Sequence, residues 1–192
     1  LRRHGVESVE GHARLVDRGV IEVDGADGER ATVLAGDVII ATGSTEVELP
    51  GVPFDHDRVI SSRDALELEE VPDALVVVGG GYIGLEMGSV YARLGSRVTV
   101  LEMMDRVLPE MDEEISEAAY KLLTEQGLDI RLGARVSGVE VDDDSATVAY
   151  EADGGAERVT ADRVLVSIGR RPVTADLGLA AVGVETGERG FI

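Results

Sequence analysis

Hydrophobic and polar residues alternate along the chain in blocks that predict an α/β protein. Residues 74–78 are continuously apolar, which is typical of a strand buried on both faces of a parallel sheet. A helix is predicted from this point to about Leu94, where Gly95 ends it, and residues 97–102 carry the next strand. The order strand, helix, strand predicts a Rossmann-like, doubly wound parallel sheet.

The same region continues with a second helix and a β-meander. A helix is predicted over residues 112–126, followed by a strand near 129–132, a three-stranded meander over about 138–160 and a return to the parallel sheet at 163–168. The predicted apolar face of that helix consists of Ile115, Ala118, Ala119, Leu122 and Leu123. Nearer the N-terminus, short strands are expected over residues 9–15, 20–23, 31–34 and 37–41, and a short helix over 63–69 with Ser61 or Ser62 as its N-cap.

An internal repeat links the two parts of the chain. Shifted by 126 residues, residues 26–43 align without gaps with residues 152–169, and seven of the eighteen positions are identical. Both segments predict a hairpin turn, a strand and a buried strand that ends in glycine, although two similar hairpins can also match by chance. We therefore predict two domains of one topology: residues 1–72 are a partial domain with a connector, 73–169 are a complete domain, and 170–192 are an exit segment that returns toward the first domain.

The turn after residues 74–78 carries Gly79, Gly81 and Gly84 in the spacing G-x-G-x-x-G. In a dinucleotide site the first glycine makes the tight turn, the second lets the backbone approach the pyrophosphate, and the third lets the helix pack closely on the strand. The N-terminus of the helix then faces the phosphate charge. Because the motif lies between a predicted strand and a predicted helix, it indicates a dinucleotide site. The alternative is a close helix–strand contact without a ligand.

Glu102 distinguishes between the two nicotinamide cofactors. It closes the second strand about 20 residues after Gly79, where an acidic residue accepts hydrogen bonds from a ribose diol. A carboxylate repels a 2′-phosphate, and Met103 and Met104 follow where NADP sites commonly supply an arginine. The sequence therefore favours NAD over NADP, with a solvent-exposed carboxylate at a strand end as the alternative for Glu102.

Further candidates lie on the first helix and at the end of the partial domain. Glu86 and Tyr82 are in the first two helical turns, where they are candidates for contact with a nicotinamide. An exposed helical glutamate and a domain-interface tyrosine are the alternatives. Residues 42–44, Thr-Gly-Ser, end a predicted buried strand at the edge where doubly wound sheets bind ligands, or form a plain turn. We predict no metal site, because the histidines are scattered and residues 142–144 lack the glycine and spaced ligands of a calcium loop.

Composition and charge narrow the classes of function. The 192 residues include no cysteine, which removes disulfides, thiolate metal sites and cysteine nucleophiles from this segment. The net charge of −20 argues against nucleic acid and anionic membranes as partners. A solvated surface suited to high salt is the favoured explanation, and an acidic face for a basic partner is the alternative. We expect a cytoplasmic protein, because no apolar run is long enough for a transmembrane helix and residues 1–4 lack the apolar stretch of a signal peptide. Residue 1 is not Met and residues 189–192 stop in mid-pattern, so we expect an internal fragment of a longer protein.

With these residues identified, the chain resembles the flavoprotein pyridine nucleotide–disulfide oxidoreductases, and among them most closely the dihydrolipoyl dehydrogenases. The resemblance spans nearly the whole chain, and it is specific for the family but less so between sister enzymes. The matching segments are residues 40–44, 49–51, 61–66, 79–86, 85–90, 93–95, 98–102 and 168–172.

The resemblance implies two cofactors, FAD and NAD. It identifies residues 1–72 as part of an FAD-binding domain and 73–169 as the NAD-binding domain. The residues expected near FAD are Ala13, Thr42, Gly43 and Ser44; the family often has glycine where Ala13 stands, so contact there would be through the backbone. The residues expected at NAD are Gly79, Gly80, Gly81, Tyr82, Ile83, Gly84, Leu85, Glu86, Glu102, Val136 and Gly169.

The resemblance also implies a function for the longer protein. It would move electrons from a dithiol, dihydrolipoamide or a lipoyl-bearing protein, through a disulfide and FAD to NAD, and it would be a homodimer at full length. The family's redox-active cysteine pair and its His–Glu pair are absent from this sequence, so we assign no catalytic residue. The alternatives are an NADH oxidase, a pyridine nucleotide transhydrogenase or a mercuric reductase-like flavoprotein and, for the chain alone, a nucleotide-binding module.

Overall fold

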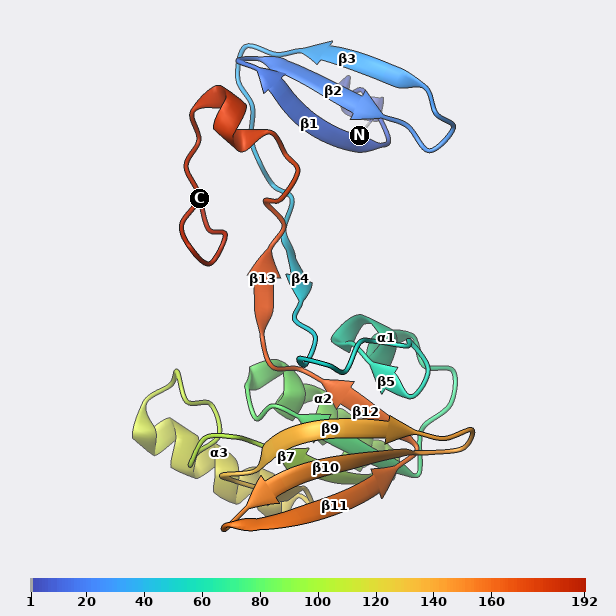
Figure 1. The fold of residues 1–192 in the computed structure, drawn as a ribbon, viewed down its shortest axis with the longest axis vertical. Coiled ribbons are helices and arrows are strands. Elements are labelled where there is room, and N and C mark those ends of the chain that lie inside the picture. Colours follow the sequence, from blue (N-terminus) through green and yellow to red (C-terminus); the bar gives the residue numbers. More distant parts are fainter. Residues whose placement is uncertain (1) are drawn as a thin grey trace. The chain divides into compact units, whose positions relative to one another are not determined.

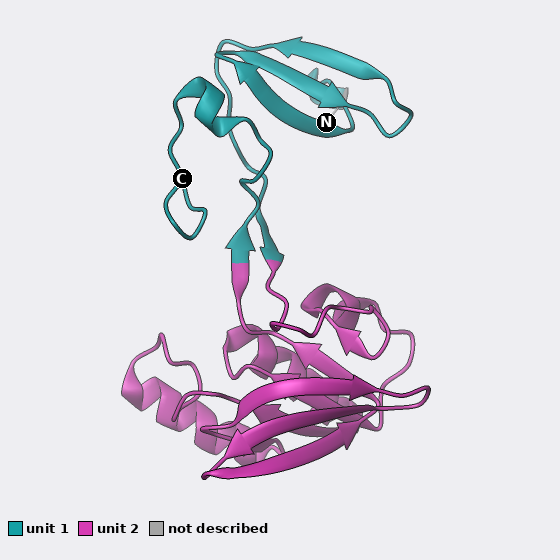
Figure 2. Cartoon of the chain, viewed as in Figure 1, with its two compact units in different colours: residues 1–45, 171–192 teal, residues 46–170 magenta. Residues whose placement is uncertain are grey.

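A computed structural model describes residues 2–192, and Figure 1 labels its helices and strands. The chain divides into two compact units, coloured separately in Figure 2. Unit 1 combines the described residues up to Thr45 with Arg171–Ile192. Unit 2 consists of Glu46–Arg170. Residues 46–72, which the sequence places in the connector of the first domain, belong to unit 2. The assignment of the domains to FAD and NAD stays a prediction.

Unit 2 is built on a five-stranded parallel sheet, which confirms the predicted Rossmann-like fold. All five residues of its central strand are buried, because both faces of the sheet are covered. In spatial order the strands are β5 (Val59–Ile60), β12 (Arg163–Val166), β6 (Ala74–Val78), β7 (Arg97–Leu101) and β8 (Asp129–Arg131).

Two different layers cover the faces of this sheet (Figure 1). Val76 and Val78 of β6 share a core with Val148 of an antiparallel meander, whereas Leu75 and Val77 share a second core with residues of the helices. This alternation follows from the period of two along a strand. The meander consists of β9 (Arg135–Val141), β10 (Ala146–Ala152) and β11 (Gly155–Ala161), and the helices are α1 (Ser62–Glu67), α2 (Tyr82–Leu94) and α3 (Glu113–Glu125).

Local sequence signals set the helix ends. Ser61 caps α1, and its side chain and that of Asp64 form a reciprocal capping box. Gly95 ends α2 in the left-handed region with φ of 112°. Asp112 caps α3 by accepting a hydrogen bond from the Glu114 N–H.

The predicted apolar face of α3 was only partly right. Ala119 and Leu123 pack against the helical core, but Ile115 and Leu122 are each 56% exposed. Ser116 is instead the most buried residue of this helix, at 2% exposed. The helix is therefore rotated about its axis relative to the prediction, because its contact with the loop before it runs through Ser116.

Unit 1 is a three-stranded antiparallel sheet with a short helical turn against it. The sheet consists of β1 (His12–Asp17), β2 (Val20–Asp24) and β3 (Arg30–Leu34), in that order. The 3₁₀ turns are η1 (Arg2–His4) and η2 (Leu179–Val182), and β4 (Ser44–Glu46) and β13 (Arg170–Pro172) form a two-stranded sheet. Just before η2, the carbonyl of Leu177 accepts a hydrogen bond from the Leu15 N–H over 2.8 Å. Only glycine fits at the next position, because a Cβ added to Gly178 would lie 1.9 Å from Leu15 O.

The buried strand predicted over residues 37–41 is wrong. These residues form no strand, and Ile39 is 91% exposed. The repeat partner of this segment is β12, which lies between β5 and β6 and is buried from Val164 to Val166. Among the described residues, no strand pairs with 37–41. The backbone of this segment therefore lacks the hydrogen bonds that a neighbouring strand would supply.

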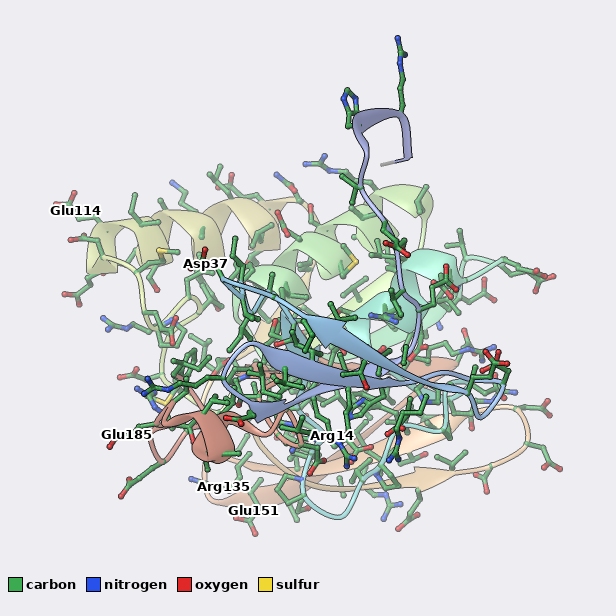
Figure 3. All side chains as sticks on the ribbon, turned by 90° about the horizontal axis from the view of Figure 1, so that it is seen from above. Arg14, Asp37, Glu114, Arg135, Glu151 and Glu185 are labelled. Atoms are coloured by element: carbon green, nitrogen blue, oxygen red, sulfur yellow. The ribbon has the colours of Figure 1, made fainter. Side chains whose placement is uncertain are left out.

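Charged side chains project from the elements of both units. Figure 3 labels Glu114 of α3, Glu151 of β10 and Glu185, all of which are exposed. Several arginines are paired with acids, such as Arg14 with Glu22 over 2.6 Å. Among the helices of the described chain, none combines the length and apolarity needed to span a membrane.

Candidate dinucleotide site

The glycine turn lies at the switch point of the parallel sheet. The chain passes from β6 to β7 on one side of β6 and later returns to β12 on its other side. All these strands are parallel, so the carboxyl ends of β6, β7 and β12, at Val78, Leu101 and Val166, share one edge. Ligands of doubly wound sheets bind at this edge, outside the switch point.

Two glycines of the motif are required by packing. Gly79 has φ of +108°, and an added Cβ would lie 2.6 Å from Ser167 O. An added Cβ at Gly84 would lie 2.3 Å from Gly79 O and 2.5 Å from the Ser167 hydroxyl oxygen. These distances are too short for any side chain, so Gly79 makes the tight turn and Gly84 lets α2 approach the strand.

Gly81 is different, because nothing lies near its missing side chain. It is the N-cap of α2 with φ of −75°, and an added Cβ would meet no heavy atom within 4 Å. No side chain caps the helix here, so the N–H groups of its first turn are free to meet an anion. Open space beside exposed backbone at the positive end of a helix fits the pyrophosphate of a dinucleotide.

Glu102 is joined directly to the glycine turn. Its carboxylate is buried, at 7% exposed, and accepts hydrogen bonds from the Gly80 N–H at 2.5 Å and the Met104 N–H at 2.7 Å. The alternative of an exposed strand-end carboxylate is therefore excluded. Each carboxylate oxygen has two lone pairs, so Glu102 retains acceptor capacity for ribose hydroxyls.

A loop that the sequence did not indicate also contacts the turn. The Leu108 N–H donates to Gly80 O over 2.9 Å, and Leu108 has φ of 46°. The Ser116 hydroxyl donates to Val107 O over 2.5 Å. Ser167 lies on the other side of the turn, where its hydroxyl donates to Val78 O over 3.2 Å. The only signal for Ser116 was a small polar residue inside an apolar helix pattern.

The remaining NAD candidates surround this centre in different ways. Tyr82, 57% exposed, and Glu86 present their side chains to solvent from the first two turns of α2. Ile83 is half-buried, whereas Leu85 belongs to the helical core and its N–H donates to Gly81 O, so neither group of Leu85 faces a ligand.

Two candidates come from outside α2 and the turn. Val136 is half-buried on β9 opposite Tyr150. Gly169 follows β12 with φ of +132°, and its carbonyl accepts the Val47 N–H over 3.1 Å.

The FAD candidates all lie in unit 1 and are exposed. Ala13 is on β1 opposite Val23. The Thr42 hydroxyl donates to Val173 O over 2.5 Å, and Gly43 O accepts the Val173 N–H over 3.0 Å. Ser44 begins β4. Two of the four residues are thus held by the segment that returns from unit 2.

A hollow in unit 1 is separate from both sets of candidate residues. It has a volume of about 740 Å³ and is lined by residues between Thr174 and Thr186 of unit 1. None of the predicted site residues lines it. We therefore locate the dinucleotide site by the glycine turn and Glu102 and not by this hollow.

Comparison with known proteins identifies the family. The family model of the pyridine nucleotide-disulphide oxidoreductases matches residues 1–192. The chain belongs to this family.

Individual relatives are similar to this chain over its whole length or nearly so. Dihydrolipoyl dehydrogenase 3 of Pseudomonas aeruginosa is 48% identical over 100% of this chain and 41% of its own length. Leghemoglobin reductase of Glycine max is 43% identical over 100% of this chain and 37% of its own. The crystal structure of LpdA from Mycobacterium tuberculosis superimposes with a TM-score of 0.87 and 31% identity, covering 98% of this chain and 42% of that one. The chain thus spans about two fifths of the length of the relatives it matches.

Proposed function

We propose that the full-length protein is a dihydrolipoyl dehydrogenase-like oxidoreductase. It oxidises a dithiol, either dihydrolipoamide or a lipoyl-bearing protein, and transfers the electrons through a disulfide and FAD to NAD. The 48% identity to a dihydrolipoyl dehydrogenase over the whole chain supports this proposal. The redox cysteines and the His–Glu pair would lie outside this sequence, so the chain contributes cofactor binding rather than catalytic residues.

The structural observation that carries the NAD-binding part of the proposal is the hydrogen bond between the glycine turn and Glu102. The backbone around Gly81 and the N-terminus of α2 would hold the pyrophosphate, and Glu102 would accept hydrogen bonds from the ribose. Tyr82 and Glu86 would lie beside the nicotinamide. Val136 and Gly169 would add apolar and backbone contacts.

Each cofactor has its own role. NAD supplies a hydride acceptor when it is bound, and FAD would be held in part by Ala13, Thr42, Gly43 and Ser44. NAD is favoured over NADP because the buried carboxylate of Glu102 would repel a 2′-phosphate. Met103 and Met104, which follow it, are exposed and carry no positive charge.

The direct test is the reduction of NAD by the full-length protein with dihydrolipoamide as electron donor. We expect NADH formation that depends on the dithiol and is far slower with NADP. A full-length protein that carries FAD but does not form NADH with dihydrolipoamide contradicts the proposal.

A second candidate is a flavoprotein that uses NADH without a dithiol. An NADH oxidase, a transhydrogenase or a mercuric reductase-like enzyme would use the same nucleotide domain. A relative that is 43% identical is named for reduction of a protein, leghemoglobin, and not for a dithiol substrate. NADH consumption with oxygen or a metal ion as acceptor, without a dithiol, would identify it. The nucleotide-binding module, the homodimer and the cytoplasmic location stay predictions.

A further inference from the structure

The Gly80–Gly81 peptide is fixed through its carbonyl by the loop between β7 and α3. The Leu108 N–H donates to Gly80 O over 2.9 Å, while the N–H of Gly80 is held by Glu102. In a planar trans peptide, the carbonyl of one residue and the N–H of the next point in opposite directions. The bond from Leu108 therefore sets the direction of the Gly81 N–H, at the position where Cβ space is open.

Leu108 holds this position from an unfavourable backbone conformation. Its φ of 46° lies in the left-handed region, where a residue with a branched side chain is strained. Such a conformation persists only when its surroundings fix it. Here the Leu108 carbonyl accepts the Met111 N–H over 2.8 Å, and the preceding Val107 is fully buried in the helical core.

Ser116 anchors the same loop to α3. Its hydroxyl donates to Val107 O over 2.5 Å, and the side chain is 2% exposed. A continuous path of contacts thus runs from Ser116 through Val107 and Leu108 to the carbonyl of Gly80.

We propose that Leu108 and Ser116 are positioning residues of the dinucleotide site. They hold the glycine turn in the binding conformation before the dinucleotide arrives, which lowers the ordering cost of binding. This inference rests on the proposed function, because it requires that the turn bind NAD(H). Loss of the Ser116 hydroxyl should weaken NADH binding about three- to tenfold, which corresponds to the usual cost of ordering a loop or side chain.

Ser96 provides a matched control for Ser116. It is also buried, at 7% exposed, and its hydroxyl also donates to a backbone carbonyl, Pro72 O, over 2.5 Å. Ser96 precedes the first residue of β7, so it lies at the opposite end of the strand from Glu102. Ser116→Ala and Ser96→Ala therefore remove the same kind of bond, and only the first is linked to the glycine turn.

The experiment measures NADH binding by fluorescence titration of the full-length wild-type protein, Ser116→Ala, Ser96→Ala and Ser116→Thr, together with their unfolding free energies. We expect NADH affinity to fall three- to tenfold in Ser116→Ala, to stay within twofold in Ser96→Ala, and to recover in Ser116→Thr, which restores a hydroxyl. Hydrogen exchange should show a less protected Leu108 amide in Ser116→Ala alone.

The outcomes separate this inference from the proposed function. If the wild-type protein binds NADH and the two alanine variants bind it equally well or equally poorly, the positioning role is wrong and the proposed function stands. If the wild-type protein fails to bind NADH at all, both are wrong.

Discussion

The backbone N–H of Gly80 donates to the carboxylate of Glu102 over 2.5 Å, although the two residues are 22 positions apart in the sequence. This bond ties the turn after β6 to the end of β7, the two places where a dinucleotide-binding domain meets pyrophosphate and ribose. Glu102 therefore has two functions in our account: it orders the turn and it selects the ribose.

Replacing Glu102 with glutamine should impair both functions, and each has its own measurement. Glutamine has one acceptor oxygen, so it can satisfy the N–H of Gly80 or that of Met104, but not both. We expect a loss of about 1–3 kcal/mol in unfolding free energy. We also expect the ratio of NADPH to NADH affinity to rise, because the charge that repels a 2′-phosphate is gone. Titration with both nucleotides and chemical denaturation measure these effects, and an unchanged affinity ratio would show that Glu102 does not select the cofactor.

Gly84 should not tolerate a side chain. In Gly84→Ala the new Cβ would lie 2.3 Å from Gly79 O, so α2 must move away from β6 at a cost of about 1–3 kcal/mol. Gly88→Ala on the same helix is the control, because its Cβ would meet Val98 and Leu128 at 3.4 and 3.5 Å, and alanine favours helix formation. Thermal or urea unfolding measures both variants. Equal stabilities would mean that the close approach of α2 is not required by the fold.

Asp64 should make the folded protein sensitive to acid. Burial raises the pKa of Asp64, but hydrogen bonds from the Ser61 N–H and hydroxyl and from His56 outweigh burial, so the pKa lies below its usual range. The folded form then holds this proton less tightly than the unfolded form. Its contribution to stability is complete above about pH 4 and is lost as the pH falls through the lowered pKa.

Unfolding of Asp64→Asn as a function of pH tests this contribution. We expect the variant to be less stable than the wild-type protein at pH 7, and the difference to shrink as the pH falls below about 4. Asp144→Asn, at an exposed hairpin tip, is the control and should follow the wild-type curve. A stability difference for Asp64→Asn that does not change between pH 7 and pH 3 would contradict the linkage.

Strands and helices whose signals are local could be predicted from the sequence. The five apolar residues of β6, the glycine spacing after it and the caps at Ser61 and Gly95 each act over a few neighbouring residues. The segment 37–41 is apolar at four of its five positions, but a strand needs at least one partner strand, and the described residues contain none for it. Its sequence alone therefore predicted a strand that the structure lacks.

The candidate site was predictable in outline but not in its supporting contacts. Motif spacing indicated Gly79, Gly81, Gly84 and Glu102, because their roles follow from the geometry of one turn. The left-handed backbone of Leu108 has no signal in residue type, since leucine rarely adopts it. The burial of Ser116 depends on how the preceding loop folds, which no helical period specifies.

The measurement that tests the central claim most directly is NADH binding by Gly81→Ala in the full-length protein. The added Cβ meets no protein atom within 4 Å and φ is −75°, so unfolding free energy should change by no more than about 0.5 kcal/mol. The methyl group would occupy the space in which we expect the pyrophosphate, so NADH affinity should fall at least about tenfold, whereas Gly88→Ala should bind as the wild-type protein does. Unchanged NADH binding by Gly81→Ala would contradict the claim that this turn holds the dinucleotide.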